Sequence, residues 1–192
     1  MKPRVLVAFA SVGGNTAETA RLLAVAATEA GAEVTGPVDV RGKNAGILLG
    51  FDGLLIGEPT WGEGTHHTDF APFDASMAAM LQPGQKLVRV RAAAYGGCDR
   101  AYRNFGRAVE LIEDRLVACG ASVVQRGLKI ELAHNDHSRA FTRQWALDFL
   151  SRVQGRLETQ PYRPAMGKAD VDAVMGISAQ ERKRRDNAGL MQ

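Results

Sequence analysis

The chain has 192 residues, of which 45% are hydrophobic, and this is enough for one domain with a single buried core. The net charge is a mild +3, and the two cysteines, Cys98 and Cys119, together with a start that lacks the features of a secretory signal, indicate a cytoplasmic protein. No apolar run approaches the roughly 20 residues that cross a bilayer, so we expect no membrane span.

Short runs rich in Val, Leu and Ile alternate with segments of helical period, which predicts βαβ units and a parallel sheet. The expected strands are residues 4–10, 33–40, 52–57, 86–94 and 122–131. The expected helices are residues 16–30, 69–81, 103–119 and 137–153. Together these elements predict an α/β fold with an open, doubly wound, five-stranded sheet and helices on both faces.

The segment 157–192 lies beyond this plan, so we divide the chain into a domain at 1–156 and a C-terminal extension at 157–192. Four residues in it argue for an extended stretch: Pro161, Pro164, Gly167 and Gly176. Ser178 and Glu181 have the spacing of a capping box, which predicts a short basic tail helix. We interpret its four consecutive basic residues as a solvated helix face rather than a nucleic-acid, membrane or acidic-protein site, and expect no nucleic acid partner.

The turn between the first strand and the first helix is a candidate phosphate site. Its residues are Ser11, Val12, Gly13, Gly14, Asn15 and Thr16. Backbone N–H groups converge at a helix start, where the helix dipole also favours negative charge. The polar side chains here can add hydrogen bonds without any Lys or Arg. The alternative is that the glycines only make a tight turn.

Two further loops follow the third and fourth predicted strands, and each places an aromatic residue beside glycines. The first holds Pro59, Thr60, Trp61 and Gly62; the second holds Tyr95, Gly96, Asp99 and Tyr102. In a doubly wound sheet these loops gather at the carboxyl edge, beside the phosphate turn. Trp61 and Tyr102 are therefore candidates to sandwich a planar ring whose phosphate tail reaches the first loop.

With these three loops, the sequence resembles the short-chain flavodoxins over about residues 4–152. The motifs that carry the resemblance are the phosphate turn with its following Thr-Ala-Glu-Thr, the Thr-Trp-Gly loop, Tyr-Gly-Gly-Cys-Asp-Arg-Ala-Tyr, and residues 120–128, which resemble the entry into the family's fifth strand. This strand runs without a long interruption, which matches the short-chain subgroup. The resemblance implies strand order 2-1-3-4-5 and non-covalently bound FMN. It also implies a protein that shuttles single electrons between a reductase and a redox acceptor, an electron carrier more than an enzyme with its own substrate.

The resemblance also implies roles for individual residues. Ser11, Asn15 and Thr16 would hold the phosphate, and Trp61 and Tyr102 would flank the isoalloxazine ring. The Gly62 carbonyl would turn to accept a hydrogen bond from the flavin N5–H, and Asp99 would lie at the pyrimidine end of the ring.

Four features depart from the family pattern. Gly13 stands where a second hydroxyl is usual, and Pro59 replaces a hydroxyl ahead of the Thr-Trp pair and has no backbone N–H. We therefore expect weaker FMN binding than in typical members. The sequence pI of about 9.1 contrasts with the acidic character common in the family. Cys98 lies in the ring loop, where we favour a structural role over a redox-active thiol.

Two other functions remain open from the sequence. One is an NAD(P)H-dependent quinone or nitro reductase of flavodoxin-like fold, in which the C-terminal extension would supply a dimer contact. The other is a non-redox binding domain with weakened FMN affinity, suggested by Gly13 and Pro59. No cluster of His, Cys or carboxylate residues has metal-ligand spacing, so we expect no metal.

Overall fold

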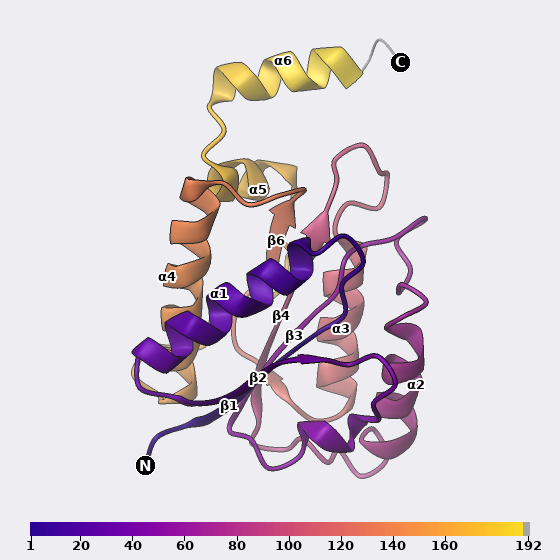
Figure 1. Cartoon of the computed structure of the whole chain (residues 1–192), viewed down its shortest axis with the longest axis vertical. Helices are drawn as coiled ribbons and strands as arrows, with labels where there is room; N and C mark the ends of the chain where they lie inside the picture. The colour runs from indigo at the N-terminus through magenta and orange to yellow at the C-terminus, as the bar shows by residue number, and fades with distance from the viewer. Residues whose placement is uncertain (190–192) are drawn as a thin grey trace.

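A central parallel sheet lies between two helical layers, with a C-terminal extension at one end (Figure 1). The structure, a computed structural model, describes residues 1–189 and the side chains up to Arg184. Residues 190–192 and the side chain of Arg185, part of the predicted extension and its basic run, lie outside the described part.

The strands are β1 (Arg4–Phe9), β2 (Glu33–Asp39), β3 (Gly53–Gly57), β4 (Arg91–Cys98), β5 (Ser122–Val123) and β6 (Leu128–Glu131). The helices are α1 (Asn15–Glu29), the short 3-10 helix η1 (Ala45–Leu48), α2 (Ala71–Met80), α3 (Arg107–Ala118), α4 (Asp136–Val153), α5 (Lys168–Met175) and α6 (Ala179–Gly189). All strand pairs are parallel, in the order β2-β1-β3-β4-β5, and β6 also pairs with β4. This confirms the predicted doubly wound α/β sheet.

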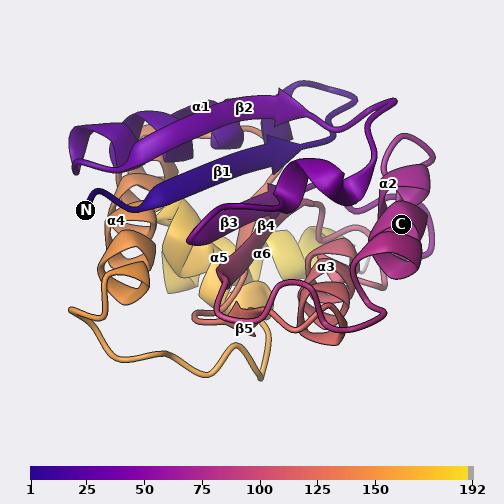
Figure 2. The ribbon, with the colours of Figure 1, turned by 90° about the horizontal axis from the view of Figure 1, so that it is seen from below.

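The alternation of side chains along β1 divides the core into two layers. Val5 and Val7 are buried with α1 and α4, whereas Leu6 and Ala8 are buried with α2 and α3. Successive side chains on a strand point to opposite faces, so a continuous apolar run suits a sheet that is covered on both sides. Figure 2 shows the two helical layers on either side of the strands.

The fourth strand begins and ends later than predicted. Residues 86–90 form a turn, in which Arg89 has a φ of +74° and the Leu87 N–H donates to the Cys119 carbonyl at 2.9 Å. Leu87 is an apolar residue that is buried beneath this turn, and in the sequence it could not be distinguished from a strand residue. As a consequence Tyr95, Gly96 and Cys98 belong to β4 and not to a loop.

The predicted fifth strand, residues 122–131, is interrupted between β5 and β6. The Gly127 N–H donates to Oε1 of the buried Glu113 at 2.8 Å, and Gln125 Nε2 donates to the Trp145 carbonyl at 3.2 Å. These bonds turn the intervening chain away from the sheet. The break covers residues 124–127, so the expected continuous strand 122–131 is two strands, although the fifth strand has no long interruption, as predicted. The sequence did not indicate this short break, because the break depends on contacts with α3 and α4, which are distant in sequence.

The C-terminal extension contains one helix that the sequence did not predict, α5. Gly167 lies at the N-cap of α5, where its N–H donates to Asp170 Oδ2 at 2.9 Å, and Gly176 ends the helix with a φ of +70°. The two glycines that suggested an extended stretch are therefore helix caps. Residues 157–166 form neither helix nor strand, and α6 begins directly after Ser178, whose hydroxyl accepts a hydrogen bond from the Glu181 N–H at 3.2 Å.

The extension packs against the rest of the chain. The Gln160 N–H donates to the Val124 carbonyl at 2.8 Å, and Arg163 pairs with Glu113 at 2.7 Å. Val171 and Val174 of α5 are buried in the same core layer as α1 and α4. Within residues 1–189, no helix has both the length and the apolar character that a membrane crossing requires.

The buried carboxyl of Glu113 makes the stability of the fold depend on pH. Burial raises the pKa of Glu113 to about 7, although Arg163 and the Gly127 N–H oppose the shift. Because the folded-state pKa lies above the unfolded value, its stabilising contribution is complete below the unfolded pKa and is lost as the pH rises through about 7.

We therefore expect the free energy of unfolding to fall as the pH rises from about 5 to 8, and Glu113→Gln to flatten that decrease by about 2 kcal/mol. The Gln carbonyl can still accept from the Gly127 N–H but does not titrate. Urea unfolding at several pH values measures the effect. An unchanged slope in the variant would contradict this assignment.

Candidate functional site

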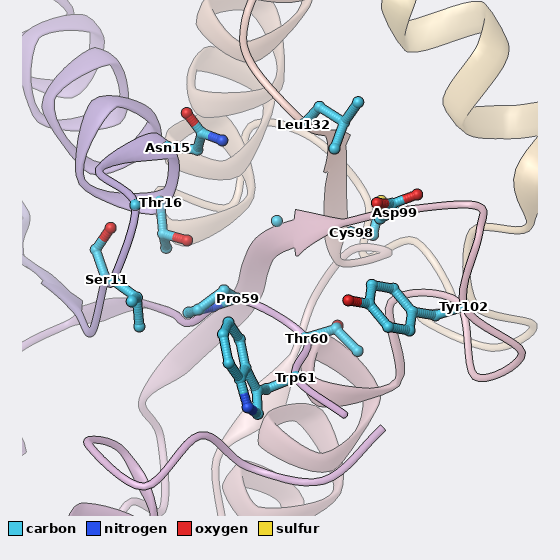
Figure 3. A pocket seen from close by; sticks show the side chains of 13 residues that line it. Ser11, Asn15, Thr16, Pro59, Thr60, Trp61, Cys98, Asp99, Tyr102 and Leu132 are labelled. Carbon is cyan, nitrogen blue, oxygen red and sulfur yellow. The ribbon is translucent and has the colours of Figure 1, made fainter. Parts of the chain in front are cut away.

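A cavity of about 280 Å³ opens at the carboxyl edge of the sheet, between the segments that follow β1, β3, β4 and β6. Its lining residues are Ser11, Val12, Gly13, Asn15, Thr16, Pro59, Thr60, Trp61, Gly97, Cys98, Asp99, Tyr102 and Leu132. In Figure 3, Ser11 and Thr16 lie on one side of this space and the ring of Tyr102 lies on the other, with Trp61 below. The structure thus brings together residues of all three loops that the sequence singled out.

The first wall of the cavity is the turn before α1. Gly14 is the N-cap of α1 with a φ of +89°, and its N–H donates to the Ser11 hydroxyl at 3.1 Å. No described side chain caps α1, so N–H groups of its first turn are left for a ligand. They add to the hydroxyls of Ser11 and Thr16 and to the amide of Asn15. The turn is therefore built as an anion site, and among the described side chains no Lys or Arg lines the cavity.

The opposite wall presents two aromatic side chains to solvent. Trp61 is 55% exposed and Tyr102 is 50% exposed, and both border the cavity. Aromatic side chains usually bury most of their surface, so two exposed ones beside one cavity indicate a planar apolar ligand. The edge of the Trp61 ring contacts His67, with the ring centroids 5.0 Å apart and the planes at 88°.

The loop that carries Trp61 is held by a buried carboxyl group. Glu58 is fully buried; its Oε1 is hydrogen-bonded to His66 Nδ1, and its Oε2 accepts from the His67 N–H at 3.1 Å. Burial raises the pKa of Glu58. Burial alone would lower the pKa of His66, but the hydrogen bond and charge of Glu58 raise it. The pair ties the start of the loop to its end, with Trp61 between them.

Backbone bonds fix the remaining parts of the two loops. The Thr60 N–H donates to the Gly97 carbonyl at 2.9 Å, which joins the Trp61 loop to β4. The carboxylate of Asp99 accepts from the Ala101 N–H at 2.8 Å, which closes a turn at the end of β4. Gly62 has a φ of +51°, and nothing lies within 4 Å of the position that a Cβ would occupy. As a glycine, Gly62 has a wider range of backbone conformations than other residues.

Four predicted residues do not line the cavity: Gly14, Gly62, Tyr95 and Gly96. Gly14 and Gly62 shape the adjoining loops. Tyr95 is fully buried beneath the site, and its hydroxyl donates to the Ala8 carbonyl at 2.9 Å. A Cβ on Gly96 would come within 2.2 Å of the Glu58 carbonyl oxygen, so this glycine allows β3 and β4 to approach. Both residues lie inside β4 because that strand is longer than predicted.

Three lining residues were not predicted, namely Gly97, Cys98 and Leu132. Cys98 is nearly buried, and burial raises the pKa of its thiol to about 12, which fits the structural role favoured from the sequence. Leu132 is 57% exposed and follows β6 directly. Its position after a parallel strand was the signal that could have placed it at this edge.

Comparison with known proteins adds independent information. The family described as Flavodoxin matches residues 7–145. Probable flavodoxin 1 of Bacillus subtilis (strain 168) is 31% identical over 149 residues, which cover 77% of this chain and 90% of that protein. Flavodoxin from Nitratidesulfovibrio vulgaris (strain DSM 19637 / Miyazaki F) is 34% identical over 133 residues, covering 66% and 84%. The crystal structure of oxidised Flavodoxin 1 from Bacillus cereus superposes with a TM-score of 0.71 at 34% identity, covering 77% and 97%.

The position of Tyr95 generates a stability prediction. Tyr95→Phe removes the buried hydrogen bond to the Ala8 carbonyl, so we expect a loss of about 1 kcal/mol in the free energy of unfolding. Tyr102→Phe, at a half-exposed ring on the cavity rim, is the control and should change that free energy by less than about 0.5 kcal/mol. Urea unfolding of both variants measures the difference. Equal stabilities would show that the buried hydroxyl contributes nothing.

Proposed function

The chain belongs to the flavodoxin family, and from this premise we propose that the cavity at the carboxyl edge of the sheet holds its FMN. As a flavodoxin it is an FMN-binding electron-transfer protein. The observation that carries the placement is the pairing of two unlike walls. On one wall, a helix start without a side-chain cap and without cationic side chains can bind an anion; on the other, two aromatic rings are exposed. FMN fits both walls because it joins a phosphate to a planar ring system.

The phosphate is assigned to the turn from Ser11 to Thr16. The hydroxyls of Ser11 and Thr16, the amide of Asn15 and the backbone of Val12, Gly13 and Gly14 surround the start of α1. The partial positive charge of the helix N-terminus complements a dianion, so this chain needs no cationic side chain in the cavity. This assignment places the phosphate at the end of the cavity farthest from Tyr102 (Figure 3).

The isoalloxazine ring is assigned to the other end. Trp61 and Tyr102 flank it, Pro59 and Thr60 lie along it, and Asp99 lies at its pyrimidine end. The Gly62 peptide has the freedom to offer its carbonyl to the flavin. Bound FMN supplies the one-electron chemistry, and the protein positions the ring and excludes water from it.

The partners follow from this arrangement. Flavodoxins transfer electrons to redox partner proteins, and we assign docking of a reductase and an acceptor to the cavity rim with the exposed rings of Trp61 and Tyr102. The flavodoxin relatives favour this electron carrier over the NAD(P)H-dependent reductase. The family fold is assigned to residues 1–156, with 157–192 as an added segment.

Thr16→Ala tests the placement of the phosphate. We expect the variant to bind FMN about tenfold more weakly, because it loses a hydrogen bond to a charged group, while its affinity for riboflavin, which lacks the phosphate, stays unchanged. Quenching of flavin fluorescence measures both affinities. Thr28→Ala is the control, since its hydroxyl donates to the Ala24 carbonyl in the last turn of the same helix.

The wild-type titration tests the function itself. Absence of quenching at micromolar FMN would overturn the flavin assignment, and rapid oxidation of NAD(P)H by the loaded protein alone would favour a reductase. Equal weakening of FMN and riboflavin in Thr16→Ala would move the phosphate away from this turn.

Gly13→Ser tests whether the missing hydroxyl limits affinity. A Cβ at Gly13 would meet no atom within 4 Å, and the backbone there has no positive φ. We expect the added hydroxyl to tighten FMN binding by about tenfold. Gly14→Ser is the matched control: its φ of +89° disfavours a side chain, so it should lower stability and give no gain in affinity. Unchanged affinity in Gly13→Ser would mean that this hydroxyl is not needed.

A further inference from the structure

Arg100 lies between Asp99 and Tyr102, two residues of the cavity wall, but it does not line the cavity itself, because its side chain points into the protein. The Arg100 side chain is only 15% exposed. Its Nε donates to Glu131 Oε1 at 2.8 Å, and its Nη2 donates to Asp172 Oδ1. Glu131 immediately precedes Leu132, another residue of the wall. One side chain therefore links the segments after β4 and β6 to α5.

Asp172 comes from the C-terminal extension, outside the part of the chain that matches the family. It is fully buried, and its second oxygen lies 2.6 Å from Arg182 Nε at the start of α6. Figure 1 shows α5 beside β6, at the end of the sheet where the cavity opens. A buried carboxylate requires close cationic partners, so Asp172 and Arg100 hold each other in place.

A second contact from α5 reaches the same segment through its backbone. Lys168 Nζ donates to the carbonyl of Arg100 at 3.0 Å and lies 6.0 Å from the centre of the Phe105 ring. Between Asp99 and Tyr102 the segment has two internal hydrogen bonds, from the Tyr102 N–H to the Asp99 carbonyl at 3.2 Å and from the Ala101 N–H to the Asp99 carboxylate at 2.8 Å. A short surface segment with so few internal bonds takes its conformation from such outside contacts.

We propose that Asp172 and Lys168 are positioning residues for FMN, which act through Arg100 to hold residues 99–102 in the conformation that forms the cavity wall. The extension is thus a support of the flavin site and not only a surface for other proteins. This inference rests on the proposed function, because it assumes that the ring lies against Asp99 and Tyr102.

The main test is Asp172→Asn in the full chain, which keeps the volume and removes the charge. We expect its FMN dissociation constant, from fluorescence quenching, to rise about tenfold. Asp170→Asn is the matched control: Asp170 lies on the same helix and pairs with Arg126 at 2.8 Å, away from the cavity wall. Its dissociation constant should stay within about twofold of wild type.

A double-variant cycle separates positioning from general destabilisation. If Asp172 acts through Arg100, Asp172→Asn with Arg100→Met binds FMN no more weakly than Arg100→Met alone. Additive losses in the double variant would overturn the proposal. Circular dichroism of the apoproteins establishes that each compared variant is folded.

Lys168→Met keeps the proposal testable if the buried variant does not fold, because Lys168 is exposed. The loss of its hydrogen bond should raise the FMN dissociation constant about fivefold. Wild-type affinity in both Asp172→Asn and Lys168→Met would overturn this inference alone. Failure of the wild-type chain to bind FMN would instead overturn the proposed function.

Discussion

The parallel alignment of β1, β3, β4 and β6 is the constraint on which the site depends. Because every strand runs in the same direction, the segments that follow them emerge at one edge of the sheet. Residues from four distant parts of the sequence thereby line one cavity. The two buried layers fix this edge, since β1, β3 and β4 are each held by apolar side chains on both faces.

Within that edge, the two ends of the cavity use different physics. The turn before α1 offers oriented N–H groups and neutral hydroxyls, which suit an anion without adding a cation beside the ring. The other end offers exposed aromatic surface held by the buried pair of Glu58 and His66. The cavity thus offers separate surfaces for a charged group and a planar group, while Asp99 is the single charged side chain among the described residues that line it.

The C-terminal extension changes how the family fold is completed. Gln160 forms a backbone bond beyond β5, Arg163 meets the buried Glu113, and Asp172 meets Arg100 near the cavity. One backbone hydrogen bond and two ion pairs thus join the extension to the segment between β5 and β6, to α3 and to the segment that follows β4. The surplus of basic residues in the sequence is thus partly used internally, since Arg163 and Arg182 both face carboxylates.

The sequence by itself determined the alternation of strands and helices, the doubly wound sheet, and the three loops that meet at its carboxyl edge, because these depend on local periodicity and on glycine, proline and capping residues. It placed the start of β4 too early, because the turn at Leu87 is held by a bond to the distant Cys119. It did not indicate the break after β5, which depends on the bond from Gly127 to Glu113. It missed α5, because the burial of Val174 depends on packing against distant parts of the chain. Tyr95 and Tyr102 both stand in the same glycine-containing segment, so the sequence could not distinguish their roles. Tertiary packing buries Tyr95, whose hydroxyl donates to the Ala8 carbonyl of β1, and leaves the Tyr102 ring at the cavity.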